Sequence, residues 1–152
     1  MRIRMKLKKA IVVGGAVACS LLTASARALR AQSASSVWDG VYAEQQAARG
    51  STLYSQNCGS CHGDHLQGKH PTPALAGETF KGNWNGQTLD DLFEKIQTTM
   101  PADKPGQISR AQNADILAFI LKSNDFPAGK DDLQSDAEKL KQVRFETARP
   151  GK

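Results

Sequence analysis

Two cysteines and a histidine form the most chemically informative run in this sequence: Cys58, Cys61 and His62, in the order Cys-Gly-Ser-Cys-His. The C-x-x-C-H spacing is typical of covalent haem attachment, in which two thiols bond to the two vinyl groups of one porphyrin. The imidazole that follows the second cysteine then lies under the iron as an axial ligand. The run therefore predicts one covalent haem c, attached at Cys58 and Cys61 and ligated by His62.

Three other kinds of site use cysteines at this spacing. The first is a zinc site that adds His65 and His70 to the two cysteines. Only three residues separate Cys61 from His65, whereas a zinc finger has about a dozen there. The second is a thioredoxin-like redox pair, which requires a βαβ setting that the sequence does not indicate. The third, a plain disulfide, suits an exported protein but leaves His62 without a role.

The first 28 residues have the order of a secretory signal peptide. Five basic residues occur within the first nine positions, an uncharged apolar run covers 10–22, and two A-x-A sites end at Ala26 and Ala28. The apolar run is shorter than a membrane-spanning helix, so we expect 1–28 to be removed on export to the bacterial periplasm. An uncleaved anchor, or a lipid on Cys19, is the alternative and would bring the protein into contact with a membrane.

The overall charge of +5 comes from the predicted signal peptide. Residues 29–152 hold 14 basic and 15 acidic side chains, so the net charge of the predicted mature chain is −1. Within it, 39–138 has a net charge of −6 and 139–152 one of +4, which indicates an acidic domain with a basic tail on its surface. The basic isoelectric point of the whole chain therefore gives no support to nucleic-acid binding.

Met100 is the best candidate for the second axial ligand of the iron. It is the only methionine left once the predicted signal is removed, and it ends a predicted helix 38 residues after His62. A methionine that only packs in the core is the structural alternative. His65 is too near His62 to reach the opposite side of a haem, which leaves His70 as the second candidate.

Three helices are expected to position these groups. Helical spacing of apolar residues predicts the first over 43–57, directly before the cysteines. The pairs Thr88 with Asp91 and Ser109 with Gln112 have the spacing of capping boxes, and each precedes a run of apolar residues at helical spacing. These pairs predict the starts of the second and third helices.

Long loops separate the predicted helices. Residues 63–87 are rich in glycine and proline, which predicts a loop that something other than a protein core orders. Gly50, inside the first helix, indicates close packing against another helix. Ser135 and Glu138 indicate one further short helix, and no strand is expected. The predicted fold class is all-α, with three or more helices and long loops around one covalently bound haem.

The chain divides into four parts: a signal peptide (1–28), a disordered lead-in (29–38), a domain (39–126) and a C-terminal extension (127–152). The lead-in is rich in alanine, serine and glutamine, and folded structure is expected to begin near Val37. Three short helices give a small core, and the two remaining cysteines are too few for a disulfide framework. A haem packed between the helices would supply the missing apolar contacts.

The region 43–124 resembles a class I cytochrome c domain, the fold of small monohaem electron carriers. The residues that carry the resemblance are Gly50, Tyr54, the C-x-x-C-H run, Pro73-Ala74-Leu75, Thr99-Met100-Pro101 and Phe119. The resemblance implies that the first and last helices cross near Gly50 and Phe119. It also implies that the carbonyl of Pro73 accepts the Nδ1 hydrogen of His62. The domain predicted over 39–126 is thus expected to have the cytochrome c fold.

These expectations indicate an electron carrier rather than an enzyme. His62 and Met100 together would occupy both axial positions of the iron, which leaves none open for oxygen or peroxide. Redox proteins such as a dehydrogenase, an oxidase or another cytochrome are the expected partners, docking through a small interface. The chain would then be a shuttle or the electron-accepting subunit of a dehydrogenase.

Two alternatives and one further candidate residue stay open. A peroxidase-like enzyme would need an open iron position and would use His70 as its acid–base residue. A haem-based ligand sensor would release Met100 when its ligand binds. Trp84 is a candidate to hydrogen-bond a haem propionate through its indole nitrogen, with ordinary burial as the alternative role.

Overall fold

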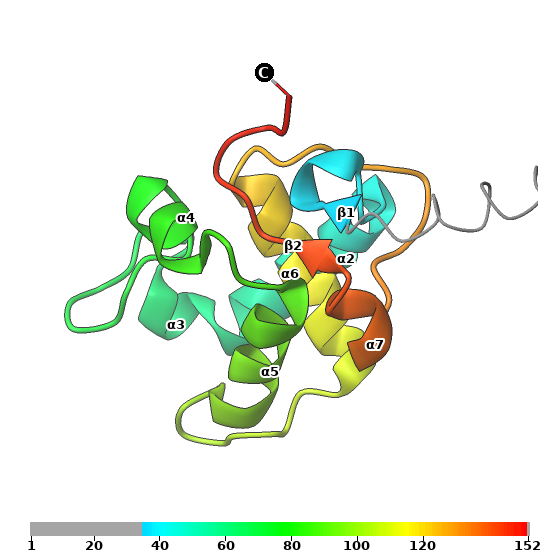
Figure 1. The fold of residues 1–152 in the computed structure, drawn as a ribbon. Helices are drawn as coiled ribbons and strands as arrows, with labels where there is room; N and C mark the ends of the chain where they lie inside the picture. The colour runs from blue at the N-terminus through cyan, green and yellow to red at the C-terminus, as the bar shows by residue number, and fades with distance from the viewer. Residues whose placement is uncertain (1–34, 152) are drawn as a thin grey trace, which may run out of the picture. The chain divides into compact units, whose positions relative to one another are not determined.

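Helices make up about half of residues 35–151, the part of the chain that the computed structural model describes. In chain order the elements are β1 (Ser35–Ser36), η1 (Val37–Asp39), α2 (Glu44–Asn57), α3 (Gly59–His62), α4 (Glu78–Trp84), α5 (Leu89–Thr99), α6 (Arg110–Ser123), α7 (Ala137–Leu140) and β2 (Val143–Arg144) (Figure 1). The all-α class is confirmed. The predicted signal peptide and Cys19 lie outside the described residues. Within those residues, no helix combines the length and the apolar character needed to cross a membrane.

The core is built on the crossing of α2 and α6. An ideal Cβ on Gly50 would lie 1.8 Å from the carbonyl oxygen of Asp115, so only glycine lets the two backbones approach this closely. Beside the crossing, the rings of Tyr54 and Phe119 pack with their centroids 5.2 Å apart. The close packing predicted at Gly50 is confirmed, and α6 is the helix that packs there.

Capping boxes begin α5 and α6, as the sequence predicts. The Thr88 hydroxyl accepts a hydrogen bond from the Asp91 N–H at 3.2 Å, and the Asp91 carboxylate accepts one from the Thr88 N–H at 2.8 Å. Ser109 and Gln112 make the same reciprocal pair at 3.2 and 3.0 Å. These bonds pair backbone donors that the first helical turn leaves free, so neighbouring residues alone determine where both helices start.

One helix lies inside the segment that we expected to be a continuous loop. α4 carries an ion pair between Glu78 and Lys81 at 2.6 Å, one turn apart, and buries a single residue, Phe80. The prediction of a loop over 63–87 is therefore wrong for the seven residues of α4. A glycine within the helix and glycines on either side of it concealed the helical spacing.

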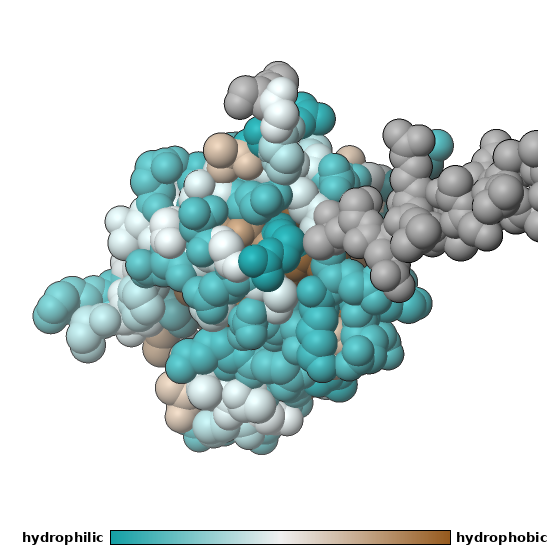
Figure 2. Space-filling model, in the orientation of Figure 1, coloured by the Kyte–Doolittle hydropathy of each residue, from teal (hydrophilic) through white to brown (hydrophobic). Residues whose placement is uncertain are grey.

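The C-terminal extension packs onto the rest of the domain. Four of its apolar side chains are buried in the core: Leu133, Leu140, Val143 and Phe145. Gln46 on α2 fastens it by two hydrogen bonds, donating to the Leu133 carbonyl at 3.1 Å and accepting from the Leu133 N–H at 2.6 Å. The basic side chains of its described part are exposed, and the face shown in Figure 2 is mostly hydrophilic.

Residues 35–38 are structured, although we expected the disordered lead-in to reach residue 38. β1 pairs in parallel with β2, Val37 is fully buried, and the ring of Trp38 packs on Phe126 with centroids 4.9 Å apart. The contacts that order this segment come from near the other end of the chain. For this reason the composition of the lead-in alone does not reveal them.

Candidate haem site

The attachment run lies on a single helical turn at the end of α2. Cys58 ends α2 and begins α3, and its carbonyl accepts hydrogen bonds from the N–H groups of Cys61 at 3.1 Å and His62 at 2.9 Å. Cys58 is partly buried, whereas Cys61 is exposed. Both thiols and the imidazole are therefore carried by one rigid segment, as attachment to a single porphyrin requires.

The imidazole of His62 is held in one orientation. The residue is 7 % exposed, and its Nδ1 lies 2.8 Å from the carbonyl oxygen of Pro73. Because a carbonyl oxygen can only accept, Nδ1 carries the hydrogen and Nε2 keeps a free lone pair for a metal. The contact that the resemblance implied between His62 and Pro73 is thus present.

The phenol of Tyr54 supports the same segment from the core. Its hydroxyl donates to the carbonyl oxygen of Gly63 at 2.7 Å, directly after His62. Burial is the main cause that raises the pKa of Tyr54 to about 12, and the neighbouring Cys58 and Asp64 contribute less. The phenol therefore keeps its hydrogen at neutral pH. Sequence reasoning placed Tyr54 on a helix face and missed this bond. A tyrosine one helical turn before the first cysteine is the signal that points to it.

Asn124 fixes the loop that carries Pro73. This residue is 2 % exposed at the end of α6, where its Oδ1 accepts from the Gly77 N–H at 3.1 Å and its Nδ2 donates to the Leu75 carbonyl at 2.9 Å. Both partners lie within four residues of Pro73, so the amide holds this part of the loop against the core. Sequence reasoning gave Asn124 no role, because an asparagine after a helix is ordinarily only a cap.

Met100 and Trp84 each lie at the end of a helix. The Met100 N–H donates to the Ile96 carbonyl at 2.9 Å, and the backbone then leaves α5 in an extended conformation. Trp84 ends α4, with its ring tilted against Phe80 at 6.4 Å between centroids. Both side chains are partly exposed. Part of each side chain is therefore accessible to a ligand.

Apolar side chains that are only partly buried occur on the elements around the attachment run. Five of them are Cys58, Leu75, Ala76, Trp84 and Ile96. They come from the start of α3, the loop after it, α4 and α5; α3 and α4 lie on the same side of the domain in Figure 1. A haem is a large apolar disc with one iron to ligate, so these side chains and the free Nε2 of the histidine fit it.

The thiol of Cys58 is unlike that of a redox-active cysteine. Burial is the main cause that raises the pKa of the Cys58 thiol to about 11, and the neighbouring Cys61 contributes less. Redox-active C-x-x-C cysteines instead have a lowered pKa, because the thiolate is the species that reacts. The thioredoxin-like alternative is therefore disfavoured.

The histidines considered for a zinc site, His65 and His70, are exposed on the loop between α3 and α4. Across the described residues, no group of three or more histidine, cysteine, aspartate and glutamate side chains is placed to hold a metal ion. These two histidines and the two cysteines are therefore not gathered into one ligand set.

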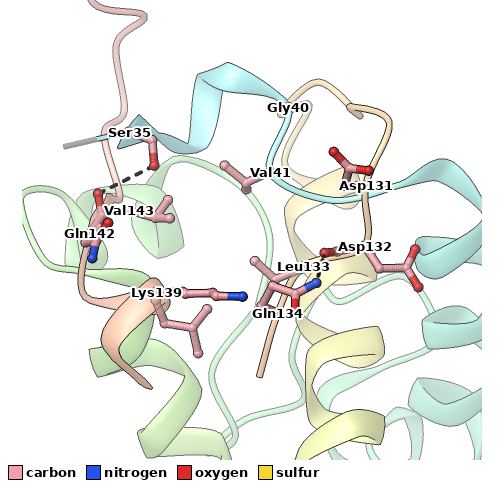
Figure 3. A pocket seen from close by; sticks show the side chains of 11 residues that line it. Ser35, Gly40, Val41, Asp131, Asp132, Leu133, Gln134, Lys139, Gln142 and Val143 are labelled. Atoms are coloured by element: carbon pink, nitrogen blue, oxygen red, sulfur yellow. Dashed lines mark hydrogen bonds between the residues drawn. The ribbon is translucent and has the colours of Figure 1, made fainter. Parts of the chain in front are cut away.

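A cavity of about 300 Å³ lies on the C-terminal extension (Figure 3). Its lining includes the apolar side chains of Val41, Leu133 and Val143 and the polar ones of Gln134 and Lys139. It shares no residue with the attachment run and is not part of the candidate haem site.

Comparison with known proteins places this chain beside a family profile, a curated protein and a solved structure. The profile of the family described as "Cytochrome C oxidase, cbb3-type, subunit III" matches residues 45–120, half of the chain. Cytochrome c-554(547) of Halothiobacillus neapolitanus is 42 % identical over 60 residues, which cover 40 % of this chain and 52 % of that protein. The chain thus spans about half the length of this curated relative. The crystal structure of the sulfane dehydrogenase SoxCD from Paracoccus pantotrophus aligns with a TM-score of 0.48 and 25 % identity, covering 71 % of this chain and 61 % of that one.

Proposed function

Since this chain belongs to the c-type cytochrome family described as "Cytochrome C oxidase, cbb3-type, subunit III", we propose that it is an electron carrier rather than an enzyme. As a member of that family it carries covalent haem c for electron transfer. In this proposal His62 and Met100 are the two axial ligands of the iron. With both positions taken, no position is open for oxygen or peroxide, and outer-sphere electron transfer is the chemistry that fits.

The observation that carries the proposal is the 2.8 Å hydrogen bond between Nδ1 of His62 and the carbonyl of Pro73. It leaves Nε2 as the ring nitrogen able to bind iron and makes that nitrogen more basic. Met100 is the only methionine beyond residue 5, and it stands where α5 ends. Its thioether is a neutral, soft ligand that favours ferrous iron.

Haem c supplies a one-electron iron couple when bound. The residues of the chain attach, orient and shield it. In the proposal Cys58 and Cys61 form the two thioether bonds, and Pro73 orients the imidazole of His62. The indole N–H of Trp84 donates to a haem propionate.

The proposed location is the bacterial periplasm. The order of basic, apolar and small residues over 1–28 supports it. In the mature protein we assign 39–126 to the cytochrome c domain and 127–152 to an extension of it. The proposed partners are redox proteins, such as a dehydrogenase, an oxidase or another cytochrome, that dock briefly through a small interface.

Spectroscopy of Met100→Ala tests the axial pair, with His70→Ala as the control. We expect the oxidised wild type to show the weak sulfur-to-iron charge-transfer band at the red end of the visible spectrum. Met100→Ala should erase this band, lower the reduction potential and open the iron to carbon monoxide, whereas His70→Ala should change none of the three. The opposite pattern would indicate two histidine ligands. Rapid binding of carbon monoxide to the wild type would favour a ligand sensor or a peroxidase-like enzyme.

A further inference from the structure

α4 buries little of its own surface. Only Phe80 among its seven residues is buried, and the helix stands apart from α2, α5 and α6 in Figure 1. A helix this short is not stable alone in water, so its position depends on what it packs against. It also carries Trp84, the side chain proposed to reach the haem.

Phe145 packs against α4. Its ring is fully buried and lies edge-on to Phe80, with centroids 6.1 Å apart, and to Phe126, with centroids 5.2 Å apart. Such edge-to-face pairs are the favoured arrangement of aromatic rings. Phe126 follows the end of α6, so Phe145 connects α4 to the central helix pair.

Hydrogen bonds join the same segment to the turn that ends α4. The Phe145 carbonyl accepts from the Gly86 N–H at 2.8 Å, and the Phe145 N–H donates to the Gln87 carbonyl at 2.9 Å. The Thr147 N–H donates to Oδ1 of Asn85 at 3.0 Å. These three bonds fix the end of the helix at which Trp84 lies.

The segment around Phe145 is itself anchored at the N-terminal edge of the domain. β2 pairs with β1, and the carbonyl of Glu146 accepts a hydrogen bond from the indole N–H of Trp38 at 2.9 Å. The segment therefore bridges this edge and α4. It lies beyond residue 120, where the match to the family profile ends.

We infer that residues 143–147, named here the C-terminal clasp, position α4 and so keep Trp84 in place to contact the haem, with Phe145 as the main positioning residue. The inference rests on the proposed haem site and adds to it a part of the chain outside the family profile. Without the clasp, α4 is free to move and water reaches the haem side of the domain. Water stabilises the additional positive charge of ferric iron, so loss of the clasp lowers the reduction potential.

Phe145→Ala tests the clasp, with Leu133→Ala as the matched control. Both substitutions remove a buried apolar side chain of the extension, but Leu133 is fastened to α2 through Gln46 rather than to α4. In the haem-loaded protein we expect hydrogen exchange of the α4 amides to rise roughly tenfold in Phe145→Ala and less than about twofold in Leu133→Ala. The reduction potential should fall only in Phe145→Ala.

Equal exchange of the α4 amides in the two variants would overturn the inference, and so would an unchanged reduction potential in Phe145→Ala. If Phe145→Ala does not fold, Asn85→Ala takes its place, because it removes only the side-chain acceptor of two hydrogen bonds from Thr147. Asn85→Ala should then raise hydrogen exchange of the α4 amides and lower the reduction potential by less than Phe145→Ala would. Exchange equal to that of Leu133→Ala, or an unchanged potential, would again overturn the inference. The proposed function is tested by a different measurement. If it is wrong, the wild type lacks the sulfur-to-iron band, and this result does not depend on the clasp.

Discussion

The α2–α6 crossing and the side of the domain that carries α3 and α4 are stabilised in different ways. At the crossing, two helices of 14 residues pack backbone against backbone at Gly50 and ring against ring at Tyr54 and Phe119. On the other side, long loops and a short helix are held by the hydrogen bonds of side chains such as Asn124 and by the clasp. The first region is specified by protein packing, whereas the second depends on a few long-range bonds and on the haem.

Gly50→Ala is the substitution expected to have the largest effect. The added methyl would lie 1.8 Å from the carbonyl oxygen of Asp115. No side-chain rotation relieves a clash with backbone, so the two helices would have to separate. We expect the free energy of unfolding of the haem-loaded protein to fall by more than about 3 kcal/mol, as measured by denaturant titration.

Gly82→Ala, in α4, is the matched control for this prediction. No atom lies within 4 Å of a Cβ at that position, and alanine is favoured over glycine inside a helix by about 1 kcal/mol. The stability of this variant should be unchanged or slightly higher than that of the wild type. A similar loss of stability in both variants would remove the proposed contrast between the two regions.

Two buried phenols, those of Tyr42 and Tyr54, are expected to make the protein less stable at alkaline pH. Burial is the main cause that raises the pKa of Tyr42 and of Tyr54 from 10 to about 12. Below pH 10 both states keep their protons and the stabilisation is fully present. Between pH 10 and 12 only the unfolded chain loses protons, so the free energy of unfolding falls. Each phenol should account for roughly 2 kcal/mol of that drop.

Denaturant titrations at a series of alkaline pH values measure this drop. Replacing either tyrosine by phenylalanine should remove about half of the contribution of the phenols, and replacing both should remove most of the drop over the same range. A drop of full size in the double variant would assign the alkaline sensitivity to groups other than Tyr42 and Tyr54.

The smallest effect is expected from the same tyrosine substitutions at neutral pH, where only Tyr54 is bonded beside the haem-binding segment. Tyr54 donates to the Gly63 carbonyl and Tyr42 to the Phe126 carbonyl, each at 2.7 Å. Loss of either bond leaves a carbonyl without its partner and should cost about 1–2 kcal/mol. Only Tyr54→Phe should also change the haem spectrum, because Gly63 directly follows the histidine ligand. An identical spectral change in Tyr42→Phe would contradict this assignment.

Local signals predicted the parts of the fold that neighbouring residues determine. The capping boxes at Thr88 and Ser109 are confirmed, because each is a contact between residues three positions apart. The close approach at Gly50 was predicted from a glycine that would otherwise weaken a helix, although spacing alone did not identify Asp115 as its neighbour. The bond between His62 and Pro73 followed from a family resemblance rather than from spacing.

Long-range contacts account for what the sequence did not reveal. α4 has one buried residue, Phe80, and the ring that packs on it belongs to Phe145, near the other end of the chain. The buried apolar residues of the extension are too few and too unevenly spaced to follow one helical or strand period throughout: Leu133, Leu140, Val143 and Phe145. Their burial depends on bonds such as those from Gln46, which no pattern within the extension predicts.

The side-chain amide of Asn124 also bears on the order in which the protein folds. It joins Leu75 and Gly77 across 49 and 47 residues of sequence, and contacts between such distant residues form slowly because the intervening chain loses entropy when it closes. The stretch around Pro73 therefore reaches its final place only once α6 has docked. We therefore expect the hydrogen-bond partner of His62 to be fixed late in folding, after most of the helical core has formed.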